Sequence, residues 1–197
     1  VRLQHYEPFG KDFSDLAKKN LSIHFVNQVK DAFGTFEVKN IIPRTDGGLI
    51  LLAESYTTNT RYVTTPNLYG YYTTHTVEEY YYNDIIAISI APDGSITWQN
   101  LLKKHQVSQD DKGYYSSFIP IINKGRVYLI FNEDIGSKTN VAGYILSQDG
   151  TVERKTLLTA GSRNIMLVCR VGAQTDWNQA LIPSLFRNYL NVVKIVY

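Results

Sequence analysis

From Thr35 onward, the hydrophobic and polar residues follow patterns that predict β-strands. Phe36 and Val38 alternate with polar residues, whereas 49–53 and 84–90 are almost continuously apolar, as expected of strands buried on both faces. The second apolar run ends in Pro92-Asp93-Gly94, and residues 95–98 then alternate. Asp-Gly is a strong hairpin signal, because the turn needs a positive φ that Gly adopts without strain.

The same order of elements recurs further along the chain. Turns are expected at 123–125 and 148–150, because each of these short segments contains a Gly. The predicted strands between and around them are 115–122, 126–131, 141–146 and 151–158. The last of these carries Glu153-Arg154-Lys155, so we expect it to be the outermost strand, in contact with water. The chain therefore predicts repeated four-stranded antiparallel units, in the style of propeller blades.

The first unit contains an insertion. Its turns, near 46 and 93, are farther apart than the matching turns near 124 and 149, by roughly 22 residues. The extra residues fall within 55–82, which holds eight tyrosines and eight threonines. Pro66–Gly70 reads as a turn, so we expect a hairpin ribbon whose arms reach ~33 Å.

The sequence pattern of a third unit is incomplete. Its strands are expected at 164–171, 179–186 and 191–197, with 1–6 as a candidate fourth strand. Three units of ~45 residues are one short of the usual minimum for a propeller. The expected fold class is therefore all-β, a partial or fragmentary β-propeller at 35–197 that follows an N-terminal strand and helical segment at 1–34.

The helical prediction rests on residues 12–33. Ser22 is placed as an N-cap, apolar residues follow at helical spacing, and Gly34 provides the stop. The chain begins Val1-Arg2-Leu3, with neither an initiator Met nor a signal peptide, so we expect either a processed chain or part of a longer one.

The segment from Asp84 to Trp98 resembles the last two strands of a quinoprotein-like or Kelch-like propeller blade. The wider stretch from Ile41 to Trp98 is similar to uncharacterised propeller-like proteins of the Gram-negative cell envelope, and the similarity extends over roughly 36–160. The resemblance implies a blade-packing role for Trp98 and supplies no catalytic residues. Because that family is typically longer, it also implies that this chain is a fragment.

The composition of the chain argues against several classes of function and structure. With 20 Lys and Arg against 18 Asp and Glu, the net charge of +2 does not indicate nucleic-acid binding. No apolar run approaches the ~20 residues of a membrane-spanning helix. The single cysteine, Cys169, excludes an intrachain disulfide and is expected to be buried and inert.

The sequence contains few candidate metal-binding or catalytic residues. The four histidines (5, 24, 75 and 105) lack metal-ligand spacing, and the pairs Asp110-Asp111 and Glu133-Asp134 match neither an EF-hand nor a nonapeptide calcium loop. There is no nucleophile elbow, P-loop or dinucleotide-binding motif. We therefore expect no cofactor, no metal and no catalytic residue.

The tyrosine-rich insertion is the main functional candidate. Tyrosines give a large amphipathic contact area at low entropic cost. The predicted partner-binding residues are Tyr62, Tyr69, Tyr71, Tyr72, Tyr80, Tyr82 and Trp177. The first hypothesis is a non-catalytic scaffold or interaction domain in an extracytoplasmic assembly (periplasm, outer-membrane surface or secreted), binding another protein or the rest of a longer chain. The alternatives are a ribbon folded back over its own domain, a glycan-binding module that uses exposed Tyr and Trp, and a fragment of a propeller-type hydrolase or lyase.

Overall fold

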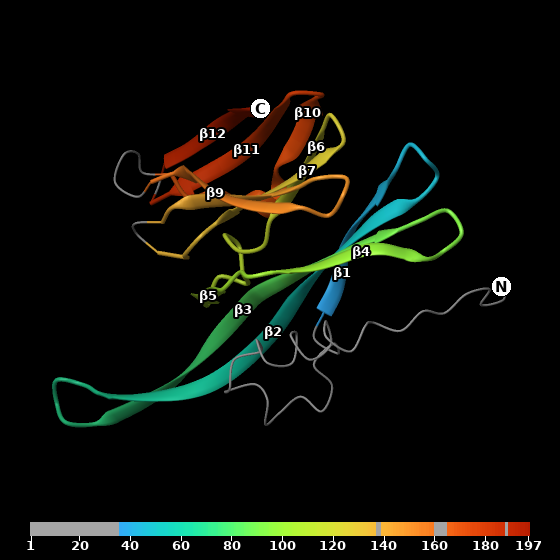
Figure 1. Ribbon diagram of the computed structural model, residues 1–197. Helices are drawn as coiled ribbons and strands as arrows, with labels where there is room; N and C mark the ends of the chain where they lie inside the picture. The colour runs from blue at the N-terminus through green and yellow to red at the C-terminus, as the bar shows by residue number, and fades with distance from the viewer. Residues whose placement is uncertain (1–35, 137–138, 160–164, 188) are drawn as a thin grey trace.

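The computed structural model describes residues 36–136, 139–159, 165–187 and 189–197. Within them the fold is all-β, with three antiparallel sheets, none of which closes on itself (Figure 1). The all-β prediction is confirmed, whereas a propeller is not identified. The predicted strand at 1–6 and helical segment at 12–33 lie outside the described residues.

Sheet A carries the long ribbon. Its strands run in the order β1-β2-β3-β4, with β5 added alongside β3. Their bounds are β1 Phe36–Pro43, β2 Leu49–Pro66, β3 Tyr72–Ile90, β4 Ile96–Leu102 and β5 Gln106–Gln109. Tight turns join β1 to β2 and β3 to β4, and in each a glycine, Gly47 or Gly94, takes the positive φ that the sequence predicted.

Sheet B has the predicted four-stranded order β6-β7-β8-β9, whereas sheet C has three described strands, β10-β11-β12. The bounds are β6 Ile119–Asn123, β7 Arg126–Asn132, β8 Val141–Leu146, β9 Val152–Leu158, β10 Ala173–Asp176, β11 Gln179–Phe186 and β12 Tyr189–Val196. The charged strand β9 is exposed and at the edge, as its Glu-Arg-Lys run predicted.

Sheet B lies between the other two. Its face toward sheet A supplies Leu129 and Phe131, which pack in one cluster with Leu52 and Ile85. Its other face contributes Ile121 and Ile130 to a second cluster, which includes Leu167 and Ile182 from the sheet C side. Trp98 packs against the first cluster.

Two strand predictions were wrong in extent. Residues 164–171 were expected to form a strand, but the described part holds one isolated bridge, at Leu167, and a short 3₁₀ helix, η1 (Cys169–Val171). The side chain of Asn132 binds both backbone polar groups of Leu167 and so takes the place of a neighbouring strand. The strand predicted at 115–122 begins only at Ile119, because Ser117 has a φ of 71°.

Candidate functional site

The candidate site is the hairpin ribbon formed by the distal halves of β2 and β3. Their pairing continues past the sheet without interruption from Tyr56↔Tyr82 to Pro66↔Tyr72. The ribbon extends away from the three sheets (teal and green, lower left in Figure 1). Because Tyr and Thr both favour extended backbone and pair well across strands, this composition stabilises an isolated two-stranded ribbon. The structure confirms the predicted hairpin and its turn.

The tip of the ribbon is an ordered turn built around Asn67. Its Oδ1 accepts backbone hydrogen bonds from Tyr69 (2.9 Å) and Tyr71 (3.0 Å). The backbone N–H of Asn67 donates to Tyr71 O (2.7 Å), and Gly70 provides a φ of 78°. The turn therefore holds Leu68 and Tyr69 outward in a fixed arrangement.

Four of the seven predicted contact residues are highly exposed on this ribbon. Tyr62, Tyr69, Tyr71 and Tyr72 each expose between 73% and 86% of their surface, and Leu68 is fully exposed. Residues 62–77 contain no Asp, Glu, Lys or Arg. The distal ribbon is thus an uncharged surface of tyrosine, threonine and leucine.

The middle of the ribbon is held by Glu79. Its carboxylate accepts hydrogen bonds from Tyr81 Oη (2.8 Å) and Arg61 Nε (2.7 Å). These two contacts, led by the tyrosine, lower the pKa of Glu79 below its ordinary value. The charged pair lies across the two strands and pins their register at this point.

The remaining ribbon tyrosines on the predicted list are buried at its base. Tyr80 and Tyr82 are 7% and 5% exposed, so neither is accessible to a partner in this structure. The ring of Tyr82 lies 4.7 Å from that of Tyr56, and Arg170 is 5.9 Å above it. Burial raises the pKa of Tyr82 to about 12, and a hydrogen bond to Glu78 raises that of Tyr80 to about 12. These rings join the ribbon to the body of the protein.

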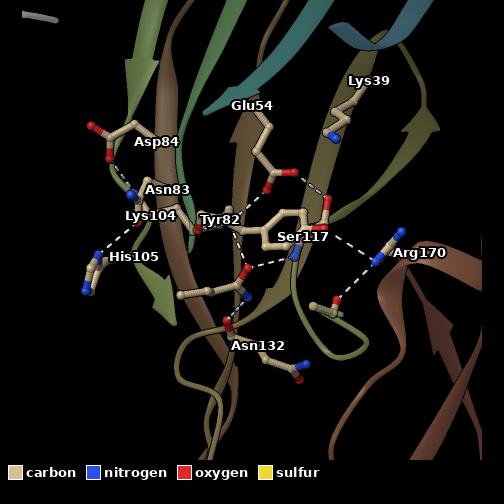
Figure 2. A network of polar contacts seen from close by, with 12 residues as sticks. Lys39, Glu54, Tyr82, Asn83, Asp84, Lys104, His105, Ser117, Asn132 and Arg170 are labelled. Atoms are coloured by element: carbon tan, nitrogen blue, oxygen red, sulfur yellow. Dashed lines mark hydrogen bonds and ion pairs between the residues drawn. The ribbon is translucent and has the colours of Figure 1, made fainter. Parts of the chain in front are cut away.

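A buried ion pair lies beside that base. Lys104 Nζ is 2.8 Å from Glu54 Oε1, and both side chains are completely buried. The ammonium also donates to Tyr82 O and to Gln106 Oε1, each at 2.7 Å (Figure 2). Burial lowers the pKa of Lys104, and the Glu54 carboxylate opposes this shift. Three acceptors therefore satisfy the ammonium where the ribbon leaves the sheet.

The network continues from Lys104 into sheet B. Ser117 Oγ donates to Glu54 Oε2 (2.6 Å), while its backbone N–H donates to Gln106 Oε1 (2.7 Å). Gln106 Nε2 donates to Asn132 O (2.6 Å), and Asn132 in turn holds Leu167. Sheet A, the β5–β6 connection, sheet B and the segment before η1 are thus joined by one buried polar network, part of which appears in Figure 2.

Hydrogen bonds to two aspartate side chains hold the connection from β5 to β6 in place. Asp111 Oδ1 accepts from Ser108 Oγ (2.6 Å) and from the Gly113 backbone (2.8 Å). Asp110 Oδ1 accepts from the Glu78 backbone (2.9 Å) and so ties this connection to the ribbon. The Asp110-Asp111 pair therefore has a structural role.

The other candidate groups are dispersed. His75 is on the ribbon and exposed, and His105 Nδ1 is 2.9 Å from Asn83 Oδ1. Glu133 binds Asn140 and Arg154, which lower its pKa. No group of three His, Cys, Asp or Glu within the described ranges is arranged to hold a metal ion. His5 and His24 lie outside those ranges.

Trp177 is on a different sheet from the ribbon. It follows β10 in sheet C, is 61% exposed, and has Lys124 Nζ 5.8 Å from its ring centre. Cys169 is buried and free of a disulfide, as predicted, and burial raises its pKa to about 12.

Comparison with known proteins finds no family model, no curated protein and no solved structure that matches this chain. In the described part of the molecule, no helix has the length and apolar character needed to cross a bilayer. The buried network was not predicted from the sequence. Its only signal in the sequence was a run of spaced polar residues, from Lys104 to Ser117, between two strongly apolar strands.

Proposed function

We propose that this protein is a non-catalytic interaction domain of an extracytoplasmic or cell-envelope assembly, and that it contacts a partner protein through the distal Tyr/Thr ribbon. The observation that carries the proposal is the ordered exposure of Tyr62, Tyr69, Tyr71 and Tyr72 around Leu68 on an uncharged, projecting hairpin. The envelope location is proposed from the similarity of residues 41–98 to propeller-like proteins of the Gram-negative cell envelope.

Preorganisation supports a contact role. A projecting hairpin held only by its own strand pairing is marginally stable, and ordering it on binding reduces affinity. Here Asn67 fixes the tip, Glu79 pins the middle, and the Tyr82 packing and the Lys104 network anchor the base. The exposed tyrosines are therefore already ordered before a partner arrives.

The test is quantitative co-purification from the native source with two variants. The first replaces Tyr62, Tyr69, Tyr71 and Tyr72 with serine and leaves the buried tyrosines intact. The matched control replaces the exposed Tyr114, which lies outside the ribbon, with serine. The proposal expects the ribbon variant to lose partners that the wild type and the control retain. Retention of every partner by a correctly folded ribbon variant contradicts it.

Glycan binding is the second candidate, and the exposure of Trp177 favours it. An exposed indole in a turn is suited to stacking on a sugar ring. Glycan-array binding that Trp177→Ala abolishes and the four-tyrosine variant retains would support this function in place of the ribbon.

A further inference from the structure

Among the described residues, sheet C has three strands, whereas sheets A and B each have a fourth strand in chain order. In those two sheets the strands follow one another in chain order, and the fourth, β4 or β9, is added beside the third. In sheet C the third strand, β12, has no neighbour beyond β11 among the described residues. No described strand therefore occupies the position equivalent to a fourth strand.

The open position borders an apolar groove. A cavity of about 790 Å³ lies along β12 and β9, and Leu158, Phe186, Val193 and Ile195 are among its lining residues. Apart from Asn191 and Lys194, the described residues that line it are aliphatic or aromatic. Leu190, Val192 and Val196 are also exposed along β12. Long, apolar edge strands pair readily with another strand unless charge, proline or a bulge prevents it, and β12 has one charged residue and an unbroken register.

On the edge of β12 opposite β11, backbone N–H and C=O groups point outward and can form hydrogen bonds with a further strand. Tyr197 donates its backbone N–H to Asn178 O on the β11 side. Because backbone direction alternates along a strand and the register has no shift, the polar groups of residues 190, 192, 194 and 196 point away from β11. These four residues therefore present N–H and C=O groups along the groove that pair with no other described strand.

We propose that β12 of a second copy of this chain occupies this position, antiparallel to the first, so that each β12 acts as the fourth strand of the other's sheet C. An antiparallel pair is self-complementary about a two-fold axis. If the two-fold axis passes through Val193, residues Tyr189–Tyr197 of one copy pair along their whole length with the same residues of the other copy. Leu190 of one copy then lies opposite Val196 of the other. Lys194 then lies opposite Val192, so this register places no like charges directly across from each other. Val193 and Ile195 of each copy add apolar surface at the groove.

Light scattering of the full chain across a wide range of concentrations tests the proposal. The expected result is a species of twice the 22.5 kDa chain mass at high concentration. Val192→Pro removes an outward N–H that β11 does not use, so it is expected to give a monomer with an unchanged circular dichroism spectrum. Val192→Thr keeps the N–H and the β-branch and is expected to remain dimeric. A wild-type monomer at every concentration, or a folded Val192→Pro protein that still dimerises, overturns the proposal.

A second measurement does not depend on the fold tolerating proline. Val193→Cys places one thiol on each side of the proposed axis, where mild oxidation is expected to link two chains by a disulfide. Lys155→Cys, on the exposed strand β9, is the matched control and is expected to stay unlinked. Absence of a linked dimer in Val193→Cys overturns the proposal.

Discussion

Lys104 Nζ lies 2.8 Å from Glu54 Oε1, and water reaches neither side chain. Glu54 is at the point of β2 where a register shift separates the sheet from the ribbon. Lys104 also holds the backbone carbonyl of Tyr82, directly across from Tyr56 on the neighbouring strand. The pair therefore fixes the ribbon at its exit from the body of the protein.

Breaking this pair on one side is expected to be strongly destabilising. Glu54→Gln or Lys104→Met leaves an uncompensated buried polar group, which costs about 3–5 kcal/mol of unfolding free energy. Replacing both, Glu54→Leu with Lys104→Met, is expected to cost less than the two single changes together. Denaturant unfolding measures all three.

The neighbouring Lys103 provides the control. Its side chain is 54% exposed and its ammonium lies 3.8 Å from Asp84 Oδ2, so Lys103→Met is expected to change stability by no more than about 0.5 kcal/mol. Equal losses for Lys103→Met and Lys104→Met would contradict a special role for the buried pair.

The ribbon is expected to loosen in acid. The pKa of Glu79 is lowered in the folded protein, so its contribution to stability is present above the ordinary value of 4.5 and is lost as pH falls through the lowered pKa. Hydrogen exchange of residues 57–81 is therefore expected to accelerate in that range. Glu79→Gln is expected to exchange faster near neutral pH and to respond less to acid; an unchanged acid response in this variant would show that another group is responsible.

Two glycines with positive φ, Gly70 at the ribbon tip and Gly113 in the β5–β6 connection beside the ribbon base, are expected to differ in the stability lost on substitution by alanine. In Gly113→Ala the new methyl lies 2.3 Å from the Tyr82 ring and φ is 65°, so we expect a loss of several kcal/mol, on the order of an overpacked core. In Gly70→Ala the tip is open and only the φ of 78° opposes the change, at about 1 kcal/mol. Gly136→Ala, with open space and no positive φ, is the neutral control. Thermal unfolding of the three variants checks the order, and a Gly113→Ala protein as stable as Gly136→Ala would be inconsistent with the packing at the base.

Cys169 is expected to be inert in the folded protein. Its thiol is buried and burial raises its pKa to about 12, so almost no thiolate is present near neutral pH. A thiol-reactive dye is expected to label it only at the rate of unfolding. Rapid stoichiometric labelling of the native protein would show that the region around η1 opens.

Local patterns in the sequence predicted most of the strands, the tight turns and the ribbon, but not the short strands β5 and β10. Asp93-Gly94 favours a tight turn, and the Thr and Tyr residues of the ribbon favour extended backbone. The buried network could not be predicted, because Glu54 and Ser117 are 63 residues apart and meet only through sheet packing. Tyr80 and Tyr82 could not be distinguished from the exposed Tyr62, because all three lie in the same Tyr/Thr-rich segment. Only the packing of the folded chain makes the first two buried. The strand expected at 164–171 is reduced to one bridge, from Leu167 to Ser184, because the chain turns into the 3₁₀ helix η1 at Cys169.

Site-specific photo-crosslinking from the ribbon tip tests the central claim most directly. A photoreactive residue in place of Tyr69, whose side chain is 86% exposed, is expected to capture a partner protein in the native assembly. The same group in place of Tyr114 is expected to capture none or far less. Partner capture from Tyr114 with none from Tyr69 would contradict the ribbon's role as the contact arm.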